Sequence, residues 1–311
     1  MKKTIDTPPI VSLCIPTNGI AEWVFPVLDS IYSQGVDSSS YEVVVADNGN
    51  NDAFQQQMRA YAQAHENLIY QRNDSYLFHN QIEALKLAQG EYLKFVNHRA
   101  PLTEGALQKL IDIVLANREN KPTLFFSNGE LRGDVIRCGS FDGFVASLRR
   151  FASWTTGVGI WREEFDRIRD HLVIDRISPH SCILFSRRHD AEYIIYNYAF
   201  CREIQTDHSK KGKYDLFKAF GVEEPTITLK LLIDGDITAD TFKQVKKDYG
   251  VFLSDLYWQF CVKRMPCSYD LRGFDDAMGV YYNKSAVILG AYGHAAMRLI
   301  GKLLKLLGIR S

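Results

Sequence analysis

Short apolar runs alternate with amphipathic stretches along the first third of the chain. The run at 10–15 is apolar and is closed by Pro16, and the β-branched run at 41–46 ends in turn-forming residues. Both runs predict buried strands. Between them, apolar residues recur from 24 to 31 at the spacing of a helix face. The pattern therefore predicts a strand–helix–strand unit near the N-terminus.

The same alternation continues to about residue 115. A helix is expected to extend to about residue 65, and Gly90 is expected to stop a later helix in a left-handed conformation. Such alternation implies right-handed crossovers and an α/β fold with a mostly parallel sheet flanked by helices. The further elements predicted are a strand at 67–70, a helix at 80–89, a strand at 91–96 and a helix that begins near Leu107.

Polar residues follow each predicted strand. In a parallel sheet the carboxyl ends of the strands lie at one edge, and ligands bind beyond that edge. We therefore expect four polar segments to meet there: Pro16-Thr17-Asn18, Asp47-Asn48, Arg72-Asn73 and Asn97-His98-Arg99.

The second half of the chain is less regular. Two short runs at 123–126 and 134–138 flank Asn128-Gly129 and predict a hairpin, and a helix is expected near 141–151. After that helix, the pattern becomes helical to the end of the chain. The predicted domains are 1–212 and a helical C-terminal region, 213–311.

The composition indicates a soluble globular protein. Hydrophobic residues make up 46% of the 311 residues and charged residues 24%, which suits a packed core. Lysine plus arginine equals aspartate plus glutamate at 37 each, so no bulk nucleic-acid binding is expected. The six cysteines form no C-x-x-C pair and are expected to be buried free thiols in a reducing compartment. No apolar signal-peptide segment precedes Pro8, so a cytoplasmic protein is expected.

Several motifs follow one another along the predicted α/β domain: Pro16-Thr17, Asp47-Asn48-Gly49-x-x-Asp52, Asn80, Ala88-x-Gly90-Glu91-Tyr92 and Leu102-x-x-Gly105-Ala106-Leu107. Their order and spacing, over roughly residues 10–115, resemble family 2 inverting glycosyltransferases with the GT-A fold. Asn97-His98-Arg99 occupies the position of the metal-binding D-x-D motif of that family. A weaker match at 157–165 is similar to the acceptor-side segment of the family.

The resemblance implies a nucleotide-sugar donor whose nucleobase and ribose lie at the first two strand ends. Thr17 and Asp47 suit this role, since a carboxylate accepts hydrogen bonds from a pyrimidine or a ribose. The alternative is that Asp47-Asn48-Gly49 is only a turn. Asn73 is a further candidate donor contact, and Asn80 is expected to cap the helix that follows it or to contact the donor.

The residues that replace the D-x-D motif determine how the negative charge of the leaving group is neutralised. Sugar transfer leaves a diphosphate, which a divalent ion held by carboxylates usually neutralises. Asn97 offers a carbonyl oxygen, but Arg99 repels a cation and instead suits phosphate oxygens. His98 can add a donor, especially when protonated. We therefore expect no cofactor and no metal. A metal held in another way and a degenerate site that binds without catalysis are the alternatives.

Inversion requires a general base that deprotonates the acceptor hydroxyl. In the window where the family usually carries an acidic base, His180 lies in the first turn of a predicted helix and Asp175 precedes it. The helix dipole disfavours the imidazolium, which keeps His180 available as a neutral base. Asp175 is the alternative base or orients His180, and a third alternative is that neither residue acts.

Acceptor contacts are expected from a segment too rich in glycine and threonine to form a helix, 153–159. Trp154 lies beside polar residues, so we expect it to contact the acceptor together with Thr155 and Thr156. Trp161 lies near an apolar run and is assigned to packing.

The C-terminal segment 285–310 is basic and amphipathic. Its longest stretch without charged residues is too short to span a bilayer, so we expect it to lie on an anionic membrane surface. The alternative is a helix docked on the protein itself or on a partner subunit. Four residues fall on one face of the predicted helix: His294, Arg298, Lys302 and Lys305.

These features predict an inverting hexosyl- or deoxyhexosyl-transferase for surface polysaccharide synthesis, peripheral on the inner face of the cell membrane. The expected donor is a UDP-sugar, with dTDP-, CDP- and GDP-sugars open, and the expected acceptor is a saccharide or a lipid-linked saccharide. The main alternative is a catalytically inactive binding or scaffold subunit of a glycan assembly complex. A nucleotidyltransferase is disfavoured, because Asn18-Gly19 does not provide a glycine-rich phosphate loop.

Overall fold

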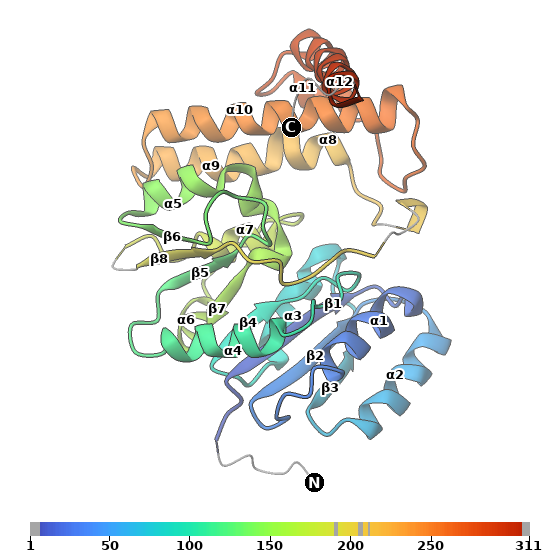
Figure 1. The fold of residues 1–311 in the computed structure, drawn as a ribbon, viewed down its shortest axis with the longest axis vertical. Coiled ribbons are helices and arrows are strands. Elements are labelled where there is room, and N and C mark those ends of the chain that lie inside the picture. The colour runs from blue at the N-terminus through green and yellow to red at the C-terminus, as the bar shows by residue number, and fades with distance from the viewer. Residues whose placement is uncertain (1–6, 190–191, 205–207, 211, 307–311) are drawn as a thin grey trace. The chain divides into compact units, whose positions relative to one another are not determined.

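The computed structural model describes residues 7–189, 192–204, 208–210 and 212–306 (Figure 1). The chain forms two compact units, one of residues 1–144 with 151–205 and the other of residues 145–150 with 206–311. The sequence pattern had suggested a single division after residue 212. It did not anticipate that a short segment from the middle of the chain belongs with the helical C-terminal region.

A five-stranded sheet forms the centre of the first unit, with the order β3-β2-β1-β4-β7. Strands β1 to β4 are parallel, and β7 runs antiparallel to β4 at one edge. This arrangement confirms the predicted mostly parallel α/β sheet. The strands are β1 (Val11–Thr17), β2 (Tyr41–Asp47), β3 (Leu68–Arg72), β4 (Tyr92–Phe95) and β7 (Gly159–Trp161).

Pro16 does not close β1, contrary to the prediction. The strand continues to Thr17, which pairs with Asp47 of β2. On the side of β4, the last ladder bond runs from Val96 N to Cys14 O. Pro16 therefore lies beyond the end of the β1–β4 ladder. Its missing N–H removes no hydrogen bond from that ladder, so the sheet loses little stability.

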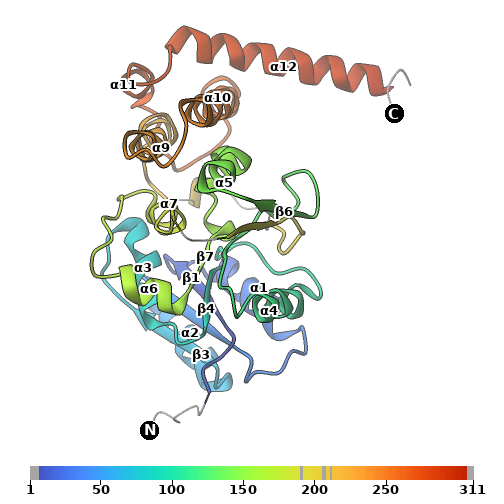
Figure 2. The same ribbon diagram turned by 90° about the vertical axis from the view of Figure 1, so that its left-hand side faces the viewer.

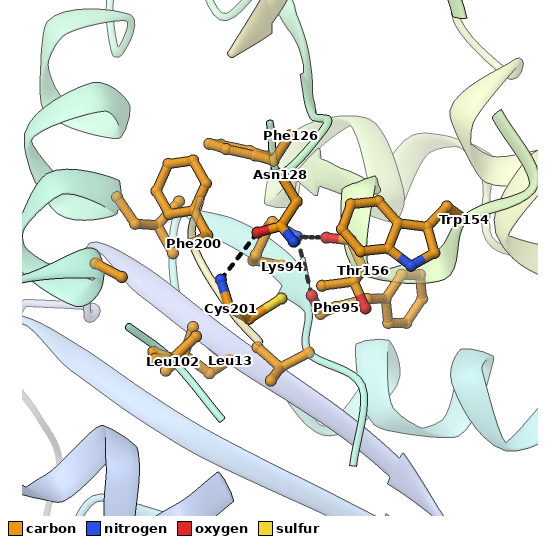
Figure 3. Close-up of a pocket in the computed structure, with 13 residues that line it drawn as sticks. Leu13, Lys94, Phe95, Leu102, Phe126, Asn128, Trp154, Thr156, Phe200 and Cys201 are labelled. Atoms are coloured by element: carbon orange, nitrogen blue, oxygen red, sulfur yellow. Dashed lines mark hydrogen bonds between the residues drawn. The ribbon is translucent and has the colours of Figure 1, made fainter. Parts of the chain in front are cut away.

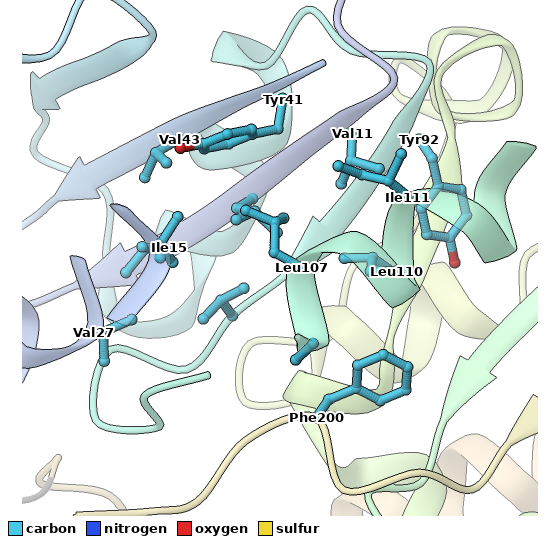
Figure 4. Packing of buried hydrophobic residues seen from close by; sticks show 14 of the residues in the cluster. Val11, Ile15, Val27, Tyr41, Val43, Tyr92, Leu107, Leu110, Ile111 and Phe200 are labelled. Carbon is cyan, nitrogen blue, oxygen red and sulfur yellow. The ribbon is translucent and has the colours of Figure 1, made fainter. Parts of the chain in front are cut away.

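Helices cover both faces of this sheet. α1 and α4 lie over one face and α3 lies over the other (Figure 2). Alternate residues of β1, namely Val11, Leu13 and Ile15, belong to the main hydrophobic core together with residues of α1 and α4 (Figure 4). Full burial of each such side chain contributes about 1.5–3 kcal/mol. The helices that follow β1 to β4 are α1 (Ala21–Tyr32), α2 (Asp52–Ala64), α3 (Asn80–Leu87) and α4 (Ala106–Ala116).

A three-stranded sheet also belongs to the first unit, with the order β5-β8-β6. β8 (Tyr193–Tyr196) is parallel to β5 (Thr123–Phe126) and antiparallel to β6 (Val135–Cys138). The predicted hairpin of β5 and β6 is therefore wrong, because the fully buried β8 supplies the ladder partners of both strands. Asn128 and Gly129 still turn the chain, with φ of 56° and 83°.

Gly90 serves close packing and is not a left-handed helix stop. Its φ is not positive, so its backbone is not left-handed. A Cβ at Gly90 would lie 2.6 Å from Ser12 Oγ and 2.9 Å from Ser12 N, and Gly90 N donates to Ser12 Oγ at 2.8 Å. The glycine therefore allows the start of β4 to approach β1.

Short helices connect the two sheets of the first unit along the chain. The helix predicted near 141–151 is shorter than expected, because its last turns are 3-10 helical from Arg149 to Ser153. The segment rich in glycine and threonine forms a single 3-10 turn, η3 (Thr155–Gly157), before β7. The α-helices are α5 (Phe141–Leu148), α6 (Arg162–Ile168) and α7 (Pro179–Leu184).

The second unit is helical, as predicted. Its helix α10 is capped by Thr238, whose hydroxyl accepts from Thr241 N at 3.2 Å. A Cβ at Gly290 of α12 would lie 2.6 Å from Ser254 Oγ of α10, so these two helices cross closely. The helices are α8 (Leu216–Lys218), α9 (Glu224–Ile233), α10 (Ala239–Leu256), α11 (Phe274–Met278) and α12 (Lys284–Leu306).

The predicted basic helix at 285–310 corresponds to α12, but most of its basic face lies outside the described side chains, which end at Ala296. Within the described part, Val287, Ala291 and Ala295 are buried, whereas Leu289 is 72% exposed. No helix among the described residues combines the length and the hydropathy needed to cross a bilayer. None of the six cysteines, all within the described ranges, is in a disulfide; three are buried, as predicted, and the other three are only partly buried.

We expect Gly90→Ala to lower the free energy of unfolding by about 1–3 kcal/mol, because the added carbon displaces Ser12 within a well-packed sheet. Gly139→Ala is the matched control, since a Cβ there meets no atom within 4 Å. Urea denaturation of both variants provides the measurement. If Gly90→Ala were as stable as Gly139→Ala, the close approach of β1 and β4 at Gly90 would contribute nothing to stability.

Candidate active site

The loops that follow β1 and β2 touch at the carboxyl edge of the sheet. A Cβ at Gly49 would lie 2.1 Å from the carbonyl oxygen of Asn18, so only glycine permits this approach. Gly19, with φ of 80°, turns the first loop beside the carboxylate of Asp47. The two loops therefore form one continuous surface next to Asp47.

Asp47 is buried and accepts hydrogen bonds on both oxygens. Gly49 N donates to Oδ1 at 2.8 Å and Tyr70 OH donates to Oδ2 at 2.9 Å. Burial raises the pKa of Asp47, while these two bonds and the charge of Arg72 oppose the rise. Each carboxylate oxygen retains a second lone pair. Asp47 is fully buried in this conformation, so a bond from a ribose hydroxyl or a base N–H stays a prediction.

Asn80 joins the ends of β1 and β2. Its Nδ2 donates to Thr17 O at 3.0 Å and to Ala46 O at 2.7 Å, while its Oδ1 accepts from Asn73 Nδ2 at 2.7 Å. The prediction that Asn80 caps the following helix is wrong, because its side chain bonds to the two strands. Asn73 Oδ1 accepts from Ser75 N and Oγ. Both amides organise the strand ends, and a contact of either with the donor stays a prediction.

The segment after β4 brings Asn97, His98 and Arg99 next to the end of β1. Asn97 Oδ1 accepts from Arg99 N at 3.1 Å. His98 Nδ1 lies 2.9 Å from Thr17 Oγ1, and the imidazole packs edge-on against the ring of Trp23. Thr17 and the replaced D-x-D segment therefore form one cluster, as the order of the strands predicted.

The surroundings of His98 favour its neutral form. Burial, followed by the charge of Arg99, lowers the pKa of His98 to about 3. The protonated form, which would be the stronger donor, is therefore disfavoured in this structure, where the partly buried ring lies beside a guanidinium. A neutral imidazole has one N–H and one acceptor nitrogen. His98 is thus suited to orienting Thr17 and to donating at most one hydrogen bond.

The guanidinium of Arg99 has unused hydrogen-bonding capacity. Its Nη2 lies 3.7 Å from Oε1 of Glu203, whose side chain is 45% exposed, and such pairs contribute little. Its Nε is buried and has no partner among the described residues. A buried N–H without an acceptor costs about 1–3 kcal/mol. An anion bound here would remove that cost and form charge-assisted hydrogen bonds.

The side chains at the D-x-D position do not fit a divalent cation. Mg²⁺ and Mn²⁺ prefer carboxylate, carbonyl and water oxygens. Only Asn97 offers an oxygen, which already accepts from Arg99 N, and Arg99 contributes a positive charge instead of a ligand. Elsewhere in the described ranges, no group of three or more His, Cys, Asp and Glu side chains is arranged to hold a metal.

His180 lies inside the protein, in the first turn of α7. Its Nε2 lies 2.8 Å from the carbonyl oxygen of Ser153, so this nitrogen carries the proton. The other nitrogen, Nδ1, is buried without a partner, and burial lowers the pKa of His180 to about 4. The predicted base is therefore a weak one whose lone pair does not reach solvent in this conformation.

Asp175 shapes the turn before α7 and is partly exposed. Its Oδ1 accepts from Ile177 N at 2.8 Å and from Ser178 N at 2.9 Å. The guanidinium of its neighbour Arg176 lies 4.9 Å from the ring centre of Tyr76, in the loop after β3. This contact places the Asp175 turn beside the carboxyl edge of the main sheet.

The predicted acceptor residues lie in and next to η3. Trp154 and Thr156 line a cavity of about 20 Å³ near the end of β4, which has room for about one water and none for a sugar (Figure 3). Thr155 is partly exposed in the same turn. Acceptor contact by these three residues stays a prediction. Trp161 packs in the interior, as assigned, and donates from Nε1 to Pro122 O at 2.8 Å.

Two residues of this region were not assigned from the sequence. Tyr70 donates to Asp47, but nothing in the pattern of β3 distinguishes it from a packing tyrosine. Lys94 is buried in β4 at 5% exposure. A lysine inside an otherwise apolar strand is a signal that could have been used, because lysine is rarely buried in full.

Comparison with known proteins agrees with this geometry. Residues 12–157 match the family model Glycosyl transferase family 2, and no curated protein matches the chain. The structure of S. aureus TarS 1–349 in complex with UDP-GlcNAc is 15% identical, with a TM-score of 0.56 over 87% of this chain and 80% of that chain. Mannosyltransferase PcManGT from Pyrobaculum calidifontis, in complex with GDP-Man and Mn²⁺, is 18% identical, with a TM-score of 0.52 over 97% and 82%.

The matched relatives include longer chains. This chain covers 65% of one TarS 1–349 structure, and in another structure of S. aureus TarS it covers 48%, about half of that chain, at 14% identity and a TM-score of 0.56. At such identities the likeness concerns the fold. Combined with the strand order, it shows the GT-A fold, within which residues 12–157 match a glycosyl transferase family 2 domain.

Proposed function

We propose that the protein transfers a sugar from a nucleotide-sugar donor with inversion and without a divalent metal. The guanidinium of Arg99 carries this proposal, since it lies where the family places its metal-binding motif and its side chain is 20% exposed. The donor diphosphate supplies the anion that this group lacks. Asp47, held by Gly49 and Tyr70, accepts hydrogen bonds from the nucleoside.

Arg99 acts on the charge that develops as the anomeric C–O bond breaks. The departing diphosphate gains negative charge, and a fixed guanidinium stabilises it without rearrangement of the site. One preorganised donor of this kind stabilises a transition state by about 3–4 kcal/mol. Neutral His98 keeps Thr17 in place and offers at most one more N–H.

The donor class follows from the neighbours in fold. TarS structures hold UDP and UDP-GlcNAc, and the mannosyltransferase structure holds GDP-Man. We propose a UDP-sugar first and a GDP-sugar second, with a hexose or a deoxyhexose as the transferred group. The paired loops after β1 and β2 support the same placement of the nucleoside.

We propose Asp175 as the general base in preference to His180. Its carboxylate is partly exposed at the carboxyl edge of the sheet, whereas the basic nitrogen of His180 is buried. An ionised carboxylate takes the proton of the acceptor hydroxyl as the oxygen attacks the anomeric carbon. Trp154 and its threonine neighbours then bind the acceptor sugar.

The acceptor and the location of the protein are proposed from α12. Its exposed Leu289 and Tyr292, with the basic residues that follow, suit an anionic membrane surface. This favours a lipid-linked saccharide presented at the inner face of the cell membrane, within surface-glycan synthesis. The competing function is an inactive binding or scaffold subunit, which would bind the donor without turnover.

Arg99→Met is expected to lower turnover by roughly 100-fold or more, because it removes the donor aimed at the diphosphate. EDTA is expected to leave wild-type turnover unchanged. Arg118→Met serves as the control, since Arg118 pairs with Glu91 at the opposite end of β4. Rates with a panel of nucleotide sugars, each with Mn²⁺ and with EDTA, provide the measurement. Loss of activity in EDTA that Mn²⁺ restores would overturn metal independence.

Asp175→Asn is expected to lower turnover by roughly 100-fold or more while donor binding is retained, because the base is lost. The amide oxygen still accepts the two N–H groups of the turn, so the fold is preserved. His180→Gln is the comparison and is expected to have a smaller effect. The reverse order of the two effects would assign the base to His180.

Replacing Arg298, Lys302 and Lys305 with glutamine is expected to weaken binding to anionic vesicles by about 1 kcal/mol per charge. Replacing the three exposed lysines Lys230 of α9 and Lys243 and Lys247 of α10 in the same way provides the control for net charge. Vesicle co-sedimentation measures both variants. Unchanged binding by the α12 variant would remove the membrane contact from the proposed function.

A further inference from the structure

Lys94 gathers backbone carbonyls from two segments of the first unit. Its Nζ donates to Phe95 O at 2.9 Å, to Thr156 O, and to Val158 O at 3.5 Å. The ammonium also lies 5.0 Å from the ring centre of Phe126. Figure 3 shows Lys94 between the end of β4 and the side chains of Trp154 and Thr156.

The ammonium of Lys94 has no carboxylate counter-charge in the part of the chain that the structure describes. The titratable groups that face it are the thiols of Cys14 on β1 and Cys201 after β8. Burial raises the pKa of both thiols, that of Cys201 to about 11, so both are neutral at pH 7. From β5, β7 and η3 only carbonyls, a phenyl ring and uncharged side chains face it.

The 155–158 segment, whose carbonyls bond to Lys94, is closely packed against its neighbours. Phe95 N donates to Val158 O at 3.1 Å, and Val158 N donates to Thr155 O at 3.0 Å. A Cβ at Gly157 would lie 2.2 Å from Phe125 Cζ. The position of 155–158 against β4 thus depends on a few close contacts, and Lys94 provides the only side-chain cation among the described groups that bond to it.

We propose that Lys94 is a positioning residue that holds the 155–158 segment against the end of β4, and so fixes Trp154, Thr155 and Thr156 relative to Asn97-His98-Arg99. The 155–158 segment carries or adjoins the candidate acceptor residues, and the end of β4 leads to the candidate donor residues. The catalytic consequence of the clamp rests on the proposed function, but the clamp itself does not.

Protonation of Lys94 makes the opening equilibrium of the 155–158 segment depend on pH in a predictable direction. Burial lowers the pKa of Lys94 to about 7, whereas the residue has its ordinary pKa, near 10.4, when the segment opens to water. Between these values the open form binds more protons than the closed form. Rising pH therefore stabilises the closed segment, by up to about tenfold in the opening equilibrium per pH unit.

Hydrogen exchange of the full chain at pH 7 to 9 tests the clamp. After correction for intrinsic rates, protection of the 154–159 peptide in the wild type is expected to rise by up to about tenfold per pH unit. Lys94→Gln and Lys94→Met are expected to abolish that rise, and Lys86→Gln, on an exposed lysine of α3, is expected to retain it. A flat wild-type profile, or the same rise in Lys94→Gln, would overturn the proposal even if Lys94→Met fails to fold.

Kinetics test the positioning of the acceptor residues. Lys94→Gln is expected to raise the KM for the acceptor by roughly tenfold, which corresponds to about 1.4 kcal/mol, with donor affinity unchanged. An unchanged KM beside an altered exchange profile would limit Lys94 to structure and contradict the positioning role. If the wild type transfers no sugar from any donor, the proposed function fails, while the exchange profile still decides whether Lys94 clamps the segment.

Discussion

Two hydrogen bonds from one buried amide determine where the site forms. Asn80 donates to the carbonyl of Thr17 at the end of β1 and to that of Ala46, the last residue but one of β2, so one buried side chain ties the two strand ends together. The close contact of Asn18 with Gly49 depends on the same alignment. Asp47, Thr17 and everything bonded to them therefore take their positions from a side chain that need not touch a substrate.

Positive charge replaces negative charge at the end of β4. Lys94 and Arg99 lie on the same strand and the segment after it, and neither is closely paired with a carboxylate. The two basic groups have different partners: Lys94, whose pKa burial lowers to about 7, donates to carbonyl oxygens inside the protein, whereas Arg99 Nε has no partner among the described residues. In the proposed mechanism, Lys94 organises the scaffold and Arg99 binds the ligand.

The sequence predicted β1 to β4 and their helices, because each alternates within a local window that periodicity can detect. It did not predict β8 or the pairing of β5 and β6, since those ladders join residues far apart in the chain. Residue identities located Thr17, Asp47 and Arg99 at one edge of the sheet. The preference of His98 for its neutral form and the burial of the basic nitrogen of His180 could not be predicted, because both depend on desolvation by distant segments.

The bond from the backbone N–H of Arg99 to Asn97 Oδ1 has a consequence for redesign. Asn97→Asp alone would add one carboxylate but would keep, two residues along the chain, a guanidinium whose charge disfavours a bound cation. Arg99→Asp alone would remove the built-in cation and leave only one anionic ligand. A divalent metal site at this position thus requires both residues to change together, because one change alone keeps the guanidinium and the other alone leaves a site with a single carboxylate.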